Sequence, residues 1–278
     1  MLQEKNGILY YTFDIFNRLT KVTAAVSARK GGVSSAPFAS LNMSFSSGDD
    51  TQLVLENRRL YLEALHIAPE DIICCNQVHG IHIEQVGNAD KGRGALEASS
   101  AIPACDGLMT HEAGVPLTMN FADCTPLLFF DPVHQAIAIS HGGWRGTAGN
   151  IAAMTLERMH KAYGTQPDTV LAAIGPAIGA CCFEVGKEVI DQFMNLFSPS
   201  EMQELARPVG EKYYFDLAKA NKILMLRAGI RADHLEEAHI CTYCRDDLFF
   251  SYRKASKHGE KTGRHMAVIM MNEGAVRP

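Results

Sequence analysis

The feature that most limits the fold of this chain is a set of short apolar runs, each bounded by turn residues. The runs are 116-PLTMNF-121, 126-PLLFF-130, 135-QAIAIS-140, 169-TVLAAI-174 and 266-MAVIMM-271. Their length is that of ordinary β-strands, and none is long enough to span a membrane. They therefore predict buried or half-buried strands, and the glycines and proline after the fourth run indicate a turn there.

Helical patterns lie between these strands. Leu55, Leu62 and Leu65 repeat at helical spacing within residues 53–66, and Ile151 begins a similar pattern that ends before a glycine. We expect helices over 53–66, 151–162, 186–197 and 215–229. Because helices and strands do not alternate strictly and no linker or repeat divides the chain, we expect one α+β domain over 1–278, with mixed β-sheets packed against helices.

Composition and charge indicate the class of partner. The chain is 47% hydrophobic over 278 residues, which is ample for an ordered core. Its net charge of -5 gives no bulk attraction to nucleic acid or to an anionic membrane, so we expect a small-molecule partner and neither of those two.

The N-terminus lacks the apolar segment of a signal peptide. The eight cysteines do not resemble a disulfide framework, which predicts reduced thiols in the cytoplasm. The oligomeric state stays open.

Three segments place a metal ligand where an apolar run gives way to a turn. They are 76-NQVHG-80, 121-FADCTP-126 and 140-SHGGWRG-146, which offer His79, Cys124 and His141. Two imidazoles and a thiolate could bind zinc and leave a fourth position for water, as catalytic zinc sites do. Gly142 and Gly143 would let a substrate approach the backbone closely. The wide spacing of the three ligands matches no short metal motif, so spacing alone predicts only a candidate site.

Several motifs together resemble one known family. The segments NQVHG, FADCTPLLFFDP, SHGGWRGTAGNI, AIGPAIGACCFEVG and FFSYRKASKHGEKTGRHMAVI, in this order, resemble the bacterial multicopper polyphenol oxidase or laccase-domain family. Residues 28–50 and 57–59 share the likeness, so it extends through nearly the whole chain. The resemblance implies a single α+β domain similar to bacterial deamidase toxins, with His79, Cys124 and His141 as the ligands of one zinc ion.

The same resemblance implies an activity. Members of the family are regarded as purine nucleoside phosphorylases that also deaminate adenosine. Adenosine, inosine and methylthioadenosine would yield the free base and a ribose 1-phosphate, so the expected partners are a purine nucleoside and phosphate. A zinc-bound water has a pKa of about 7 and would supply the nucleophile for deamination.

Other residues are candidates for substrate contacts. Arginine side chains and glycine-rich backbone bind phosphate well, and we expect the phosphate site among Arg145, Arg253, Arg264 and the loop 31–35. Trp144 could stack on the purine ring. Beside the zinc ligands Cys124 and His141, we expect Asp123 to orient a ligand or to transfer a proton, although neighbours on an extended chain point to opposite faces.

Two alternative functions fit the same residues. A copper polyphenol oxidase would use the two histidines and the cysteine as Cu²⁺ ligands, with one of twelve methionines as an axial ligand. Against it, a laccase needs a further multi-histidine copper cluster, and the chain has no paired His-x-His segment. A cysteine hydrolase, such as an enzyme that edits peptidoglycan precursors, would use Cys124 as nucleophile and His141 as base.

The segment 241-CTYC-244 has the spacing of a metal knuckle. A structural zinc ion would need a second pair of cysteines, and a redox motif would need a βαβ setting. We interpret Cys241 and Cys244 as packed thiols that help to build the wall of the site.

Overall fold

Two six-stranded sheets form the centre of the molecule, within the residues 1–274 that the computed structural model describes. The first has the strand order β1 (Leu2–Lys5), β2 (Ile8–Thr12), β3 (Val22–Ser27), β15 (His265–Met271), β7 (Leu117–Phe121) and β4 (Ile73–Cys74). The second has the order β14 (Leu235–Glu237), β10 (Leu171–Ile174), β8 (Thr125–Asp131), β9 (Ala136–Gly142), β6 (Gly107–Thr110) and β5 (Ile83–Gln85). Both sheets are mixed, because the β4–β7, β5–β6 and β10–β14 pairs are parallel and the others are antiparallel.

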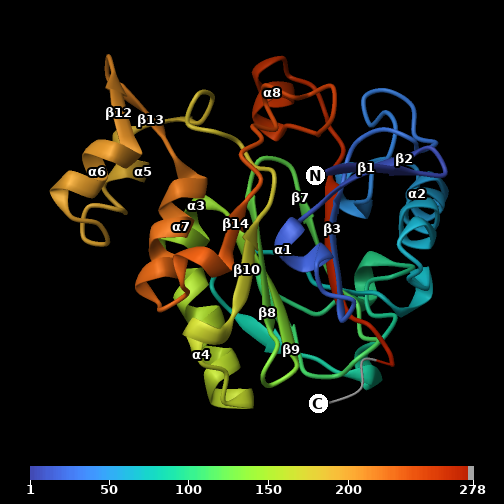
Figure 1. Ribbon diagram of the computed structural model, residues 1–278. Helices are drawn as coiled ribbons and strands as arrows, with labels where there is room; N and C mark the ends of the chain where they lie inside the picture. Colours follow the sequence, from blue (N-terminus) through green and yellow to red (C-terminus); the bar gives the residue numbers. More distant parts are fainter. Residues whose placement is uncertain (275–278) are drawn as a thin grey trace.

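Helices cover the outer faces of both sheets (Figure 1). Helix α2 (Thr51–Ala64) lies on one side, and α4 (Ile151–Tyr163) and α7 (Leu217–Arg227) lie on the other. The short helices α1 (Asp14–Asn17) and α8 (Tyr252–Lys257) lie between strands, and α3 (Trp144–Ala148) lies between β9 and α4. A small antiparallel sheet stands apart with its own two helices. It consists of β11 (Glu184–Val185), β13 (Lys212–Phe215) and β12 (Ala206–Val209), beside α5 (Lys187–Ile190) and α6 (Pro199–Leu205).

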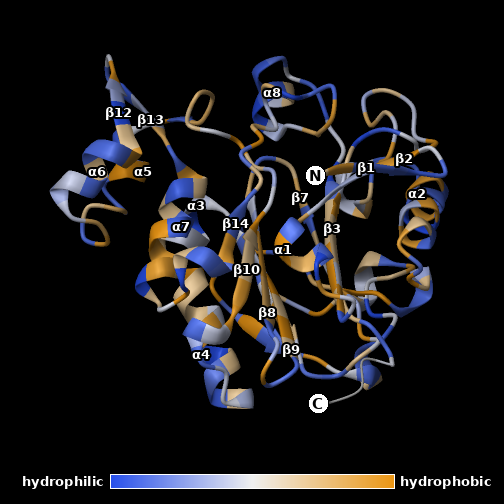
Figure 2. Cartoon of the chain, viewed as in Figure 1, coloured by the Kyte–Doolittle hydropathy of each residue, from blue (hydrophilic) through white to orange (hydrophobic). Residues whose placement is uncertain are grey.

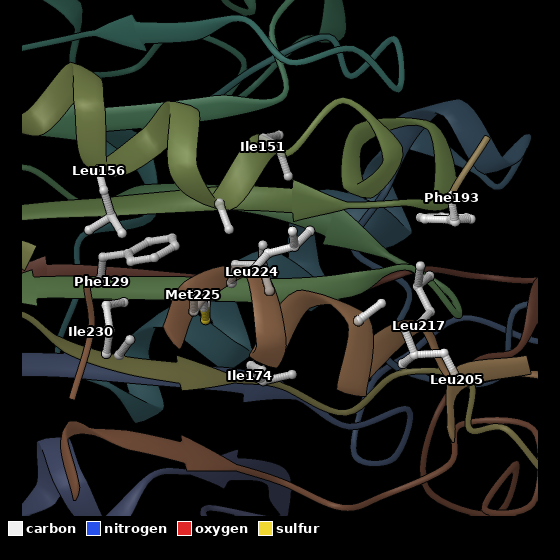
Figure 3. Packing of buried hydrophobic residues seen from close by; sticks show 14 of the residues in the cluster. Phe129, Ile151, Leu156, Ile174, Phe193, Leu205, Leu217, Leu224, Met225 and Ile230 are labelled. Atoms are coloured by element: carbon white, nitrogen blue, oxygen red, sulfur yellow. The ribbon is translucent and has the colours of Figure 1, made fainter. Parts of the chain in front are cut away.

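Alternation along the central strands explains the layers. In β8, Leu128 and Phe130 face the core between the two sheets, whereas Leu127 and Phe129 face the core beneath α4 and α7. Successive side chains of a strand point to opposite faces, so a strand that is apolar throughout needs a partner layer on each side. Figure 2 shows the apolar residues concentrated along β8, β9 and β10. The helix-side core appears in Figure 3, where α4 and α7 pack on these strands.

A third core joins α2 to the outer face of the first sheet. Tyr61 and Leu62 of α2 are fully buried against Ala25 of β3 and Val268 of β15. The order of layers is therefore helix, sheet, sheet, helix. The ends of the central strands are the places where loops from both sheets can meet.

The fold class predicted from the sequence is confirmed, and the structure is a single α+β domain. All five predicted strands and the helices over 53–66, 151–162 and 215–229 are present with ends shifted by a few residues. The prediction of a helix over 186–197 is wrong in its extent. Only Lys187–Ile190 is α-helical, and Gln192 and Phe193 bond to the carbonyls three residues earlier, which makes turns that bury Phe193 and Phe197.

Within residues 1–274, no helix combines the length and the apolar character needed to cross a lipid bilayer.

Candidate metal centre

Three side chains from distant segments converge at one end of the two sheets. His141 lies near the end of β9, Cys124 lies in the turn between β7 and β8, and His79 lies in the loop after β4. One ligand atom from each lies within 4.8 Å of the others. The two imidazole rings meet edge to face with their centroids 4.7 Å apart. The structure therefore brings together the three residues that the sequence placed in one candidate metal site.

Strand pairing explains why Cys124 and His141 meet. Thr125 pairs with Gly142 and Pro126 with His141 in the antiparallel β8–β9 ladder, so the residue just before β8 lies beside the end of β9. Asp123 has a φ of 86°, which turns the chain sharply from β7 into β8. The reversal presents the Cys124 thiol to the end of β9.

The loop that carries His79 is tied to the first sheet by Gln77. Its side-chain amide donates to the backbone carbonyl of Asn120 at 3.0 Å and accepts from the backbone N–H of Asn120 at 2.9 Å. These two hydrogen bonds resemble the paired bonds between neighbouring strands, and they hold the loop against β7. His79 itself has a φ of 61°, in the left-handed region.

Asp106 organises the centre, and sequence reasoning missed it. Its fully buried carboxylate lies 2.8 Å from Nδ1 of His141 and accepts the backbone N–H groups of Val78, His79 and Gly80 at 3.1, 2.9 and 2.6 Å. The bond to Nδ1 leaves Nε2 of His141 free to bind a metal, and the other bonds hold the His79 loop. No motif marks this aspartate, because its partners lie far away in the sequence.

Electrostatics favour the metal-binding form of Cys124, the thiolate, whereas they favour the protonated form of His141, which has to lose its proton to bind a metal. Burial acts to raise the pKa of Cys124, but His141 and His79 outweigh it and lower the pKa to about 6. Burial acts to lower the pKa of His141, but the Cys124 thiolate and Asp106 raise it to about 9. The thiolate is the form that binds metal, and with this pKa the Cys124 sulfur is mainly a thiolate near neutral pH.

A cavity of about 470 Å³ opens on the three ligands. The ligands line it together with polar groups that include Asn120, Arg264 and the exposed Tyr252. Of the predicted phosphate ligands, only Arg264 lines this cavity. Its Nη1 donates to the carbonyls of Thr262 and Gly263, both at 3.0 Å, and these two hydrogen bonds fix the position of the guanidinium beside the cavity.

The other predicted arginines lie elsewhere. The Arg145 guanidinium is exposed and stacks over the Trp144 ring at 4.2 Å, and that ring packs against the helix-side core. Arg253 donates from Nη1 to the carbonyl of Glu184 at 2.6 Å and lies over the ring of Phe183. Trp144, Arg145 and Arg253 are thus absent from the residues that line the cavity.

The two glycines after His141 do not line the cavity, but they pack tightly. A Cβ on Gly143 would lie 3.2 Å from Cδ2 of His79 and 3.3 Å from the sulfur of Cys124. A Cβ on Gly142 would lie 3.0 Å from the carbonyl of Thr125. Their observed role is to let the ligands approach the backbone of the β9–α3 turn.

The carboxylate of Asp123 is occupied by groups on the opposite side of the turn. It accepts hydrogen bonds from Thr242 at 2.7 Å, Ser251 at 3.0 Å and the backbone N–H of Arg253 at 2.6 Å. Burial raises its pKa in spite of these bonds. Asp123 therefore anchors the C-terminal loops beside the metal centre.

The loop 31–35 turns its donors inward. The backbone N–H groups of Gly32, Val33 and Ser34 bond to Ser40 Oγ, Asn57 Oδ1 and the carbonyl of Ser40. These donors hold the loop in place, and the loop does not line the cavity.

Comparison with known proteins gives consistent matches over the whole fold. Residues 23–272 match the family model described as "Multi-copper polyphenol oxidoreductase laccase". The chain is 39% identical over 250 residues to "Purine nucleoside phosphorylase YlmD" of Geobacillus stearothermophilus, covering 90% of each chain. It is 29% identical to "Adenosine deaminase RL5" of an unknown prokaryotic organism, covering 89% of this chain and 94% of the other. The crystal structure of YlmD from Geobacillus stearothermophilus superimposes with a TM-score of 0.90 at 38% identity, covering 98% of both chains.

Proposed function

The chain belongs to the multi-copper polyphenol oxidoreductase laccase family, and on that premise we propose that it is a zinc-dependent purine nucleoside phosphorylase that also deaminates adenosine. The names of its relatives support an enzyme of this kind, because relatives at 32–39% identity are purine nucleoside phosphorylases and another is an adenosine deaminase. The observation that carries the proposal is the convergence of His79, Cys124 and His141 on a cavity that also contains Arg264.

The donor set fits zinc. Two imidazoles and one thiolate are the ligand types of catalytic zinc sites with three protein ligands, and the cavity lies on the remaining side. A zinc ion bound there would supply Lewis acidity and an activated water molecule near neutral pH. Copper can use the same three ligands. However, the two groups of possible metal ligands among residues 1–274 include no second cluster of histidines of the kind that a laccase requires.

The residues of the chain divide the remaining tasks. Asp106 holds the His141 ring and the His79 loop, so the three ligands keep their places during a reaction. Arg264 presents a cation to the cavity, and we assign it to the phosphate, because a guanidinium pairs with phosphate through two parallel hydrogen bonds. The cavity volume of about 470 Å³ lies within the usual range for small-molecule sites and accommodates a nucleoside.

Two reactions follow from this assignment. In phosphorolysis, phosphate attacks C1′ of the ribose, the glycosidic bond breaks with its electron pair going to the base, and ribose 1-phosphate forms. In deamination, water replaces the 6-amino group of adenosine and ammonia leaves. Only the first reaction consumes phosphate.

Chromatography of adenosine and inosine incubated with the enzyme, with and without phosphate, tests the proposal. We expect adenine and hypoxanthine only when phosphate is present, and inosine from adenosine in both conditions. Release of no base from either nucleoside, together with copper in the protein and oxidation of phenols, would instead identify the copper oxidase.

The cysteine hydrolase makes a different prediction. A free Cys124 nucleophile would react with a thiol reagent in the zinc-loaded protein, whereas a zinc ligand is protected. We expect protection by zinc and labelling after the ion is removed.

We also propose that the enzyme acts in the cytoplasm, since a reducing compartment keeps cysteines as the free thiols that metal binding needs.

A further inference from the structure

Four cysteines from two distant segments gather outside the site described above. Cys181 and Cys182 lie in the loop between β10 and β11, and Cys241 and Cys244 lie between β14 and α8. All four sulfur atoms lie within 4.8 Å of one another. The sulfur of Cys244 is 3.5 Å from that of Cys181 and 3.4 Å from that of Cys182, and all four cysteines are free.

We propose that these four cysteines bind one zinc ion, as a second and structural metal centre. Four sulfurs arranged tetrahedrally at about 2.3 Å from zinc are separated from each other by about 3.8 Å, which agrees with the observed spacing. The observed separations are far longer than the bond of about 2.05 Å in a disulfide. A cluster of several iron atoms would hold its cysteines further apart than one ion does. The spacing therefore favours a single tetrahedral ion.

The backbone around the cluster is arranged as for a thiolate ligand. The N–H of Gly179 donates to the sulfur of Cys241 at 3.2 Å, and the N–H of Cys244 bonds to the same sulfur. A Cβ on Gly179 would lie 3.2 Å from Cβ of Cys241 and 3.3 Å from the sulfur of Cys181. The glycine thus lets the two segments come close enough for their sulfurs to share an ion.

The expected role of this ion is to fix two loops to one another. The two segments meet at Ala177, whose N–H donates to Ile240 and whose carbonyl accepts from Thr242. Thr242 in turn donates to Asp123, next to the zinc ligand Cys124. Four protein ligands close the coordination sphere, so this centre would support the loops and leave no position for substrate. It is independent of the proposed nucleoside chemistry.

Cadmium-113 NMR of the reduced full-length chain tests the proposal. Cadmium replaces zinc, and its resonance moves strongly downfield as sulfur ligands replace nitrogen. We expect two bound ions per chain and two resonances, of which the more downfield one belongs to the four cysteines. The double variant Cys181→Ser/Cys244→Ser should lose that resonance alone, and Cys124→Ala should lose the other alone. Cys75→Ser, which changes a cysteine outside both groups, should keep both.

One bound ion in the wild-type chain, with a single resonance at the position for two nitrogens and one sulfur, would overturn the proposal. So would disulfides among the four cysteines in protein purified without oxygen. The wild-type spectrum decides the question by itself even where the double variant does not fold. Zinc analysis of the purified protein gives a second measure, with two zinc ions per chain expected and one contradicting a second centre.

Discussion

His141 shows how single residues build the candidate metal centre. One side of its ring faces the Cys124 thiolate, and Nδ1 on the other side is 2.8 Å from Asp106. The same carboxylate gathers three N–H groups of the His79 loop. A single buried charge therefore sets the position of two candidate ligands, His141 and His79.

Substitution of a ligand should remove the metal and the activity. In Cys124→Ala the site loses its only thiolate. Removal of a residue that merely orients a ligand lowers metal affinity or activity by roughly 10–100-fold, and we expect zinc affinity and phosphorolysis to fall by more than that in Cys124→Ala. Zinc content of the first site and phosphorolysis of inosine measure the effect. Full activity in this variant would rule out the proposed centre.

Asp106→Asn should weaken the site without removing a ligand. Loss of the negative charge leaves the His141 ring and the His79 loop less firmly held, and we expect zinc affinity to fall about 10–100-fold. Competition with a chelating dye measures the affinity. The matched control is Asp131→Asn, because Asp131 is also fully buried, lies 2.8 Å from a histidine nitrogen and accepts backbone N–H groups, but lies away from the site. Equal losses in both variants would contradict a positioning role for Asp106.

At the scale of elements, the β8–β9 hairpin delivers Cys124 and His141 to the same place. The strands were predictable because their apolar character needs no knowledge of their partners. The pairing of Thr125 with Gly142 was not, because register depends on contacts across the sheet. For residues 186–197 the local pattern was misleading. Its apolar residues predicted a helix throughout, but turns after Ile190 bury the same residues, Phe193 and Phe197.

In the turn from β9 into α3, a side chain at Gly143 should fit only if neighbouring residues move. A Cβ there would press on His79 and Cys124 at 3.2 and 3.3 Å, so Gly143→Ala should shift the ligands by a few tenths of an ångström. Because a misplacement of about 1 Å can cost about 100-fold, we expect a several-fold loss of kcat/KM. Gly80→Ala is the control, since its Cβ would meet Asp106 at 3.5 Å, an ordinary contact. Unchanged kinetics in Gly143→Ala would show that the turn is not tightly packed in solution.

At the scale of the whole molecule, the two sheets enclose a titratable group. His265 of β15 is fully buried between Phe121 and Phe249, and neither ring nitrogen has a hydrogen-bond partner within the described residues. Burial, with the charge of Arg264, lowers its pKa to about 3. The folded protein therefore keeps this ring neutral over a range in which the unfolded chain protonates it.

This difference predicts an acid-sensitive stability. Below a pH of about 6.5 the unfolded state binds a proton that the folded state does not, so stability falls as the pH drops towards 3, by about 1.4 kcal/mol per pH unit from this residue. His265→Leu removes the titrating group and should flatten that part of the curve. Urea unfolding of both proteins at several pH values measures the difference, and parallel curves would contradict the assignment.

The sequence by itself determined the fold class and the strands, because apolar periodicity is a local property, and the type of side chain at each turn predicted the three residues of the candidate metal site. Only the tertiary structure decided the role of Asp106, the lining of the cavity by Arg264 in place of Arg145 and Arg253, and the meeting of Cys181 and Cys182 with Cys241 and Cys244. Each of these depends on segments dozens of residues apart. Their contact is set by strand order and register, which the packing of two sheets and their helices fixes as a whole.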